Sequence, residues 1–281
     1  MTRFTDIGVG DNMYSRLKKT FKMIACRTFH ILHCAKKMEY QPKEETFTDL
    51  NVMCLKKTHP DEISVRTFTN VEEGSTGADW EWWLTNSSGK QWLGLRVQAK
   101  ILNLSSNSFK GLFYTGSNGK SQMDKLIDDA AEHRMIPIYC LYTLTPQDFK
   151  TETPVVKHGC VIIDGYYGCS LLPVCDAYNL ASKKIYNIKE VMQKSYPWHW
   201  LFCWISTWKK DAHELGGFFK IMGGKPFLKE PIENYLHEKP PDYVASMIKK
   251  GKASDHLAFE IENPSNCRGI LVFAPKQPSG D

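Results

Sequence analysis

Acidic and aromatic residues alternate from position 79 to position 84, which is the pattern of a β-strand with one polar face. Turn-forming residues follow at 86–89, and an extended apolar run then continues from 92 to 100. An antiparallel hairpin over these two segments places four polar side chains on one face of a small sheet. They are Asp79, Glu81, Gln98 and Lys100.

The same kinds of pattern predict the elements around this hairpin. The expected elements are helices at 44–58 and 121–134 and extended segments at 62–69, 137–142, 159–163 and 269–273. The apolar stripe of the first helix is Phe47, Leu50, Val52, Met53 and Leu55. The second helix is expected to open with a cap formed by Ser121 and Asp124. From 44 to 142 the order is therefore αβββαβ, which is an α/β fold, and the later strands are expected to extend the same sheet.

The first 40 residues are basic, with eight Lys and Arg against three Asp and Glu. Apolar residues recur there at the spacing of an amphipathic helix, namely Met13, Leu17, Phe21 and Ile24. This helix either packs its apolar stripe on the rest of the protein, which is favoured, or lies along DNA. Because no linker follows, residues 41–281 are expected to form a single domain, with a core at about 44–142 and an elaboration at 143–281.

Composition adds broad constraints on the class of protein. The chain has 281 residues, of which 42% are hydrophobic, and this is enough to bury one large core. The formal net charge of +5 is compatible with a nucleic-acid ligand and is also common among other enzymes. Nine cysteines without C-x-x-C spacing indicate reduced thiols in a cytoplasm rather than a zinc site. No apolar run is long enough to cross a membrane.

The four polar residues of the hairpin suit the hydrolysis of a phosphodiester. Asp79 and Glu81 offer carboxylate oxygens to a hard cation, and Gln98 offers a neutral oxygen. Lys100 would orient the attacking water or stabilise the negative charge that develops in the transition state. The alternative interpretation is structural: the two acids lie on an exposed strand face and pair with Lys100 or Arg96.

Asp79 followed by Gln98-Ala99-Lys100 on the next strand resembles the PD-(D/E)XK restriction-endonuclease-like superfamily, in the branch where glutamine replaces the second acid. The proline of that motif is absent here. The resemblance covers about 44–142, and this stretch is similar to an uncharacterised bacterial family of that kind. It implies a restriction-endonuclease-like core with a mixed sheet, and Mg²⁺ as the cofactor, with Mn²⁺ as a substitute.

The resemblance also implies roles for three further residues. A glutamate of the first helix often reaches the metal or its water in this superfamily, and Glu45 is the candidate, expected to lie closer to the site than Glu44. Acids near a helix start also simply favour the helix dipole, which is the competing explanation. Gln122 and Lys125, in the first turn of the second helix, are candidates to contact a substrate phosphate, with solvated surface as the alternative.

The expected function is therefore that of a metal-dependent nuclease acting on DNA, with Asp79, Glu81 and Gln98 around the metal and Lys100 beside the water. Bacterial defence against foreign DNA is the setting that the resemblance implies. Cleavage of RNA and a noncatalytic nucleic-acid-binding or interaction module of the same fold remain alternatives, and a homo-oligomer is left open.

Overall fold

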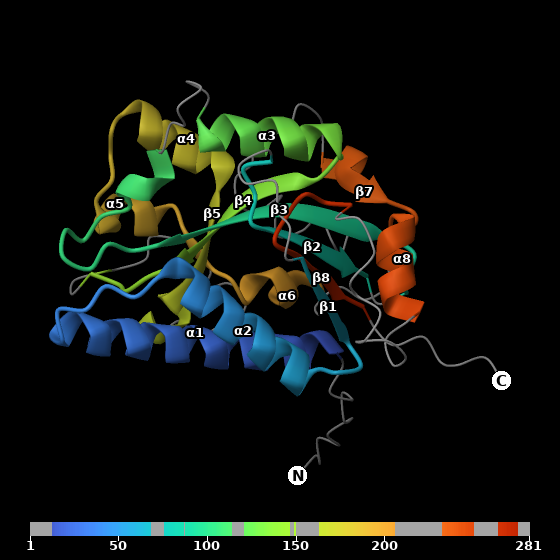
Figure 1. Ribbon diagram of the computed structural model, residues 1–281, viewed down its shortest axis with the longest axis horizontal. Coiled ribbons are helices and arrows are strands. Elements are labelled where there is room, and N and C mark those ends of the chain that lie inside the picture. Colours follow the sequence, from blue (N-terminus) through green and yellow to red (C-terminus); the bar gives the residue numbers. More distant parts are fainter. Residues whose placement is uncertain are drawn as a thin grey trace, which may run out of the picture.

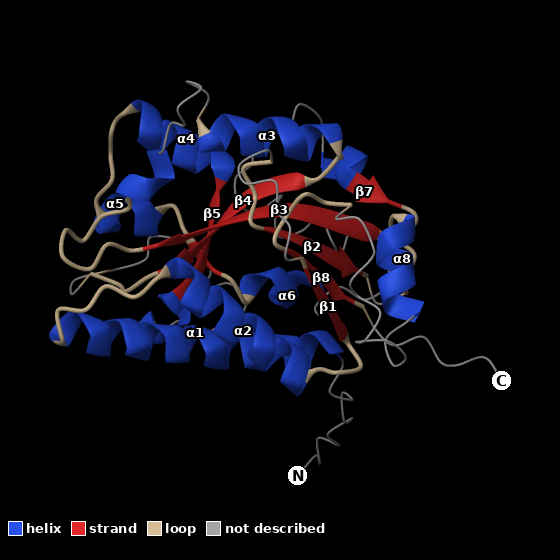
Figure 2. Ribbon diagram, in the orientation of Figure 1, coloured by secondary structure: helices blue, strands red, loops and turns tan. Residues whose placement is uncertain are grey.

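The computed structural model describes residues 13–68, 76–86, 88–113, 121–146, 149, 163–205, 232–249 and 264–274. Within these ranges the strands form one eight-stranded mixed sheet with helices on both faces (Figures 1 and 2). The α/β class predicted from the sequence is thereby confirmed.

The sheet has the strand order β1-β8-β2-β3-β4-β5-β6, and β7 pairs with β3. The strands are β1 (Ile63–Thr67), β2 (Trp80–Thr85), β3 (Trp92–Ile101), β4 (Ile136–Tyr142), β5 (Cys169–Pro173), β6 (Tyr196–Pro197), β7 (Leu236–His237) and β8 (Gly269–Phe273). β8 runs parallel to β2, and β3 runs parallel to β4, whereas the other pairs are antiparallel. The predicted hairpin is β2 and β3, paired so that Glu81 lies opposite Arg96.

Helices cover the two faces of this sheet. The α-helices are α1 (Met13–Lys37), α2 (Glu44–Thr58), α3 (Gln122–Glu132), α4 (Val174–Ser182), α5 (Ile188–Gln193), α6 (Trp200–Ile205) and α8 (Asp242–Lys249). Short 3₁₀ helices are η1 (Lys110–Phe113), η3 (Asp164–Gly168) and η4 (Ile232–Tyr235). In Figure 1, α1, α2 and α6 lie on the lower side of the sheet, and α3 and α4 lie on the upper side.

The predicted order αβββαβ is confirmed as α2-β1-β2-β3-α3-β4. α3 begins with the expected cap, in which the Ser121 side chain accepts from the Asp124 backbone N–H and the Asp124 side chain accepts from the Ser121 backbone N–H. The stripe predicted for α2 is partly wrong, because Leu50 and Met53 are exposed. The buried residues of α2 are Phe47, Thr48, Asn51 and Leu55.

The N-terminal helix packs on the sheet by its apolar stripe, as favoured from the sequence. Leu17, Phe21 and Ile24 are fully buried, and the Phe21 ring lies 4.3 Å from that of Trp198, measured between ring centroids. A smaller core lies where α3 and α8 cover β2 and β8. Its members include Trp83, Ala130, Val244, Ile270 and Val272.

The strand predicted at 269–273 is β8, but it does not extend an edge of the sheet. It lies between β1 and β2, in register with both. The strand predicted at 159–163 falls almost entirely outside the described residues, and its last residue, Ile163, is exposed. Within the described ranges, no helix combines the length and the apolar character needed to span a bilayer.

Candidate functional site

The site begins with Asp79, which lies one residue before β2. Its backbone N–H donates to Val97 O at 2.9 Å, and this places its side chain beside Gln98 of β3. The carboxylate accepts hydrogen bonds from the Ala99 backbone N–H at 2.8 Å and from the Gln98 side-chain amide. Lys100 lies two residues after Gln98 on the same strand face, and its positive charge interacts with the Asp79 carboxylate. The structure thus brings Asp79, Gln98 and Lys100 together.

Burial and charge act in opposite directions on Asp79. Burial raises the pKa of this carboxyl above its ordinary value, while Lys100, the Ala99 N–H and Arg268 lower it. The negative charge of Glu45 also raises the pKa of Asp79, because like charges repel. A carboxylate held in this way is best stabilised by additional positive charge.

Gln98 links Asp79 to the start of α3. Its amide nitrogen donates to Asp79 and, at 3.1 Å, to Ala99 O, and its amide oxygen accepts from Gln122 Nε2 at 2.8 Å. Gln122, predicted as a phosphate contact, thus lies at the site and is bonded to Gln98. Lys125 lies three residues after Gln122 in α3, and its Cβ is close to Gly77.

Glu44 is the acid of α2 that enters this cluster. It accepts a hydrogen bond from the Ile101 backbone N–H at the end of β3. Burial raises its pKa to about 7, against the opposing effect of Lys100 and with further upward contributions from Asp79 and Glu45. A carboxyl whose pKa is raised in this way by its surroundings is a common mark of a functional site.

Glu45, the residue chosen from the sequence, is 49% exposed and lies at the rim. That Glu45 approaches the site more closely than Glu44 stays a prediction, since both glutamates interact with Asp79. Glu44 is nevertheless the more buried of the two. The physical reason is the orientation of α2, whose buried residues 47, 48, 51 and 55 share a helical face with position 44. The stripe used for the prediction included Leu50 and Met53, which face away from the core.

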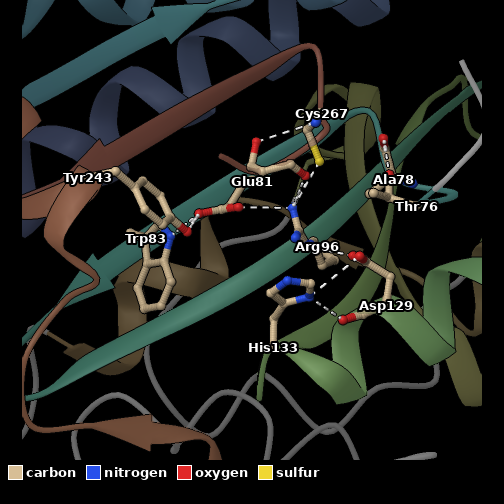
Figure 3. Close-up of polar contacts among 10 residues, drawn as sticks. Thr76, Ala78, Glu81, Trp83, Arg96, Asp129, His133, Tyr243 and Cys267 are labelled. Atoms are coloured by element: carbon tan, nitrogen blue, oxygen red, sulfur yellow. Dashed lines mark hydrogen bonds and ion pairs between the residues drawn. The ribbon is translucent and has the colours of Figure 1, made fainter. Parts of the chain in front are cut away.

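Glu81 lies next along the same strand face but belongs to a separate cluster, in which Glu81 and Arg96 are fully buried (Figure 3). Its Oε2 accepts from Arg96 Nη1 at 2.9 Å, and its Oε1 accepts from the Tyr243 hydroxyl and from Trp83 Nε1. Both oxygens are thus engaged, and a metal at Glu81 would leave Arg96 without this partner. The structural alternative weighed from the sequence, a pair with Arg96, is what the structure contains, although the pair is buried rather than exposed.

Arg96 is the centre of this second cluster. Besides Glu81 it contacts Asp129 of α3, with 2.7 Å between Nε and Oδ2, and it donates to Ser265 O at 2.9 Å. Its Nη1 also lies 3.0 Å from Cys267 Sγ. Burial raises the pKa of the Cys267 thiol to about 11 and also raises the pKa of Asp129. The cluster therefore ties β2, β3, α3, α8 and the segment before β8 together.

Arg268 is a member of the site that sequence analysis missed. Its backbone N–H donates to Asp79 O at 2.8 Å, and its Nη1 lies 3.9 Å from Glu45 Oε1. Arg268 and Asp79 are far apart in the sequence, and their proximity depends on the place of β8 beside β2. No local pattern in the sequence carries that information.

The donor chemistry at Asp79 fits a hard divalent cation. Asp79 and Glu44 supply carboxylates, and Gln98 would supply a neutral oxygen if its amide rotated, because its nitrogen now faces Asp79. Over the described ranges, no group of three or more His, Cys, Asp or Glu side chains is placed to hold a metal. A cation here would therefore depend on the amide, on backbone oxygens or on substrate for its remaining ligands.

Fold and site together define an α/β protein whose mixed sheet carries an acid, amide and lysine cluster at the start of its central hairpin. The chain belongs to a family of unknown function, DUF6615, which matches residues 17–276. The match includes most of α1 and all of β8, so the family extends over both faces of the sheet. No curated protein matches the chain.

Proposed function

We propose that this protein is a metal-dependent nuclease that hydrolyses phosphodiester bonds in DNA at the Asp79 cluster. The observation that carries the proposal is the convergence of Asp79, Gln98 and Lys100 on neighbouring strands, beside the partly buried carboxyl of Glu44. The resemblance to PD-(D/E)XK nucleases supports it, because the αβββαβ order holds and brings these residue types together.

Asp79 and Glu44 would hold Mg²⁺, or Mn²⁺ in its place, with the Gln98 amide oxygen as a neutral ligand. When bound, such an ion neutralises phosphate charge and lowers the pKa of water. The rotation of Gln98 would break its bonds to Asp79 and Gln122, so the two amides must rearrange together.

Lys100 supplies a fixed positive charge beside Asp79. Its ammonium would either orient the attacking water or bind the oxygens of the phosphate as they gain negative charge. Glu81 is left out of the reacting set, since Arg96, Tyr243 and Trp83 occupy its carboxylate.

A noncatalytic nucleic-acid-binding module is the second candidate. The orientation of Gln98 favours it, because the amide nitrogen closes a hydrogen-bonded cluster with Asp79 that needs no cation. In this alternative the cluster fixes the hairpin, and the surrounding lysines and arginines bind phosphates without cleaving them.

The test is cleavage of labelled DNA and RNA by the purified protein in Mg²⁺ or Mn²⁺, compared with Asp79→Ala and Lys100→Ala. Each variant is expected to lose about a hundredfold or more in rate, as when a single electrostatic group is removed from other enzymes. Lys183→Ala, at an exposed position beyond α4, is the matched control and should cleave like the wild type. Wild-type cleavage no faster than that of Lys100→Ala would leave the binding module as the better account. Cleavage of RNA alone would correct the substrate.

We also propose a cytoplasmic setting, with defence against foreign DNA as the role and a homo-oligomer as an open form. Seven of the cysteines in the described ranges are not joined in disulfides, which suits a reducing compartment.

A further inference from the structure

We propose that Arg268 is a phosphate-binding residue of this site. Its guanidinium binds the substrate phosphate adjacent to the phosphate that Lys100 contacts. The inference rests on the proposed function, since it assigns the binding of the same phosphodiester substrate. It is carried by the placement of Arg268 in the sheet and by the loose contacts of its guanidinium.

The backbone of Arg268 is fixed from two sides. Its N–H donates to Asp79 O at 2.8 Å, and its carbonyl accepts from the Phe68 N–H at 3.0 Å. It directly precedes β8, which pairs with β1 on one side and with β2 on the other. The backbone of Arg268 is therefore anchored beside the backbone of Asp79, and only the Arg268 side chain is left to move.

The side chain, in contrast, is only loosely held. Its Nη1 is 3.9 Å from Glu45 Oε1, beyond hydrogen-bond distance, and the two side chains are 43% and 49% exposed. Exposed ion pairs of this kind contribute little to stability. The planar guanidinium can therefore leave Glu45 at small cost and bind a phosphate through two parallel hydrogen bonds.

The charge balance around Asp79 makes such an exchange favourable. Three carboxylates, those of Asp79, Glu44 and Glu45, interact with two cations, Lys100 and Arg268. A bound divalent cation would make this set net positive, and the phosphates of a nucleic acid would restore neutrality. Arg268 would then pair with a phosphate of the nucleic acid instead of with Glu45.

The competing explanation is that Arg268 serves only as a counterion for Glu45 and Asp79. The two accounts differ in the salt dependence of binding, because each phosphate contact releases counterions from DNA whereas an internal ion pair releases none. Removing a phosphate-binding cation should lower the slope of log affinity against log salt by about 1.

The experiment measures binding of a short labelled duplex DNA by fluorescence anisotropy over a range of salt concentrations, in Ca²⁺ to limit cleavage. Arg268→Ala should weaken binding about tenfold at low salt and lower the salt slope by about 1. Arg268→Lys should keep the slope and recover part of the affinity, because it keeps the charge but not the bidentate geometry. Lys183→Ala should match the wild type.

An unchanged salt slope in Arg268→Ala overturns the inference, and so does a wild type that binds no DNA in this assay. Circular dichroism of each variant checks the fold, and Arg268→Lys keeps the comparison valid if the alanine variant is unstable. Cleavage measured on the same preparations separates the two proposals. If DNA binding depends on Arg268 but no cleavage is seen, only the proposed nuclease activity is contradicted. If the protein cleaves DNA but Arg268→Ala leaves the salt slope unchanged, only the proposed role of Arg268 is contradicted.

Discussion

Two consecutive glutamates at the start of α2 have different surroundings, and the difference decides which one belongs to the site. Glu44 is the more buried of the two and bonds to the end of β3, whereas Glu45 faces Arg268 at the rim. Sequence spacing alone did not separate them, because both positions precede the same short run of apolar residues. In the structure α2 is turned so that the polar residues Thr48 and Asn51 are buried, and this rotation places Glu44 on the inner face of the helix.

Replacing each glutamate in turn tests this assignment. Glu44→Gln should raise the Mg²⁺ concentration needed for half-maximal cleavage and lower the rate by about tenfold or more, because a carboxylate near the metal is lost. Glu45→Gln should change the metal requirement much less and should tighten DNA binding, because a negative charge beside Arg268 is removed. Metal titrations of both variants provide the measurement. A stronger metal effect from Glu45→Gln would restore the choice made from the sequence.

At the scale of elements, the segments predicted well are those whose signals are local. Alternation fixed β2 and β3, and the Ser121 cap fixed the start of α3, since both patterns lie within a few residues. The neighbours of β8 could not be predicted, because a parallel pair with β2 joins segments nearly 190 positions apart. Arg268 was missed for the same reason, whereas Asp79, Gln98 and Lys100 were found because one hairpin carries them.

The contact between α1 and η3 offers a sharp test of how the N-terminal helix is attached. A Cβ at Gly168 would collide with the Ala25 carbonyl oxygen and lie 2.7 Å from the Phe29 backbone nitrogen, both in α1. Gly168→Ala should therefore force the two elements apart and cost about 1–3 kcal/mol, as overpacking of a core does. Gly111→Ala is the control and should be close to neutral, because among the described residues its Cβ would meet only the Lys100 side chain, at 3.8 Å.

Urea denaturation of both glycine variants supplies the free energies of unfolding. Equal stability of the two would mean that α1 and η3 do not approach each other this closely.

At the scale of the whole molecule, the cluster around Arg96 joins the hairpin to the C-terminal half. Glu81 lies on β2, Asp129 on α3 and Tyr243 on α8, and Cys267 precedes β8 (Figure 3). Ser265, whose carbonyl oxygen accepts from Arg96, also precedes β8. The elaboration predicted at 143–281 is thus part of the structure that holds the hairpin in place. Buried charges of this kind are costly to leave without partners.

Arg96→Met should consequently lower the free energy of unfolding by about 3–5 kcal/mol, because it removes the cation that balances the buried carboxylate of Glu81 and the partly buried carboxylate of Asp129. Arg16→Met removes an arginine from a partly exposed pair with Glu62 and should cost no more than about 1 kcal/mol. Urea denaturation gives both values, and hydrogen exchange should show faster opening of α8 in Arg96→Met. If the two variants were equally stable, the cluster would not be what binds the halves together.

The position of β8 also has a consequence for the order in which a ribosome delivers this chain. β1 and β2 follow one another along the chain, yet they are not neighbours in the sheet, and the strand that separates them is made nearly 190 residues after β2. Until Gly269–Phe273 emerges, β1 lacks its partner, and the backbone carbonyl of Asp79 lacks the Arg268 N–H. Pairings over such long sequence separations form late and slowly. The growing polypeptide therefore carries an incomplete site until β8 has been synthesised.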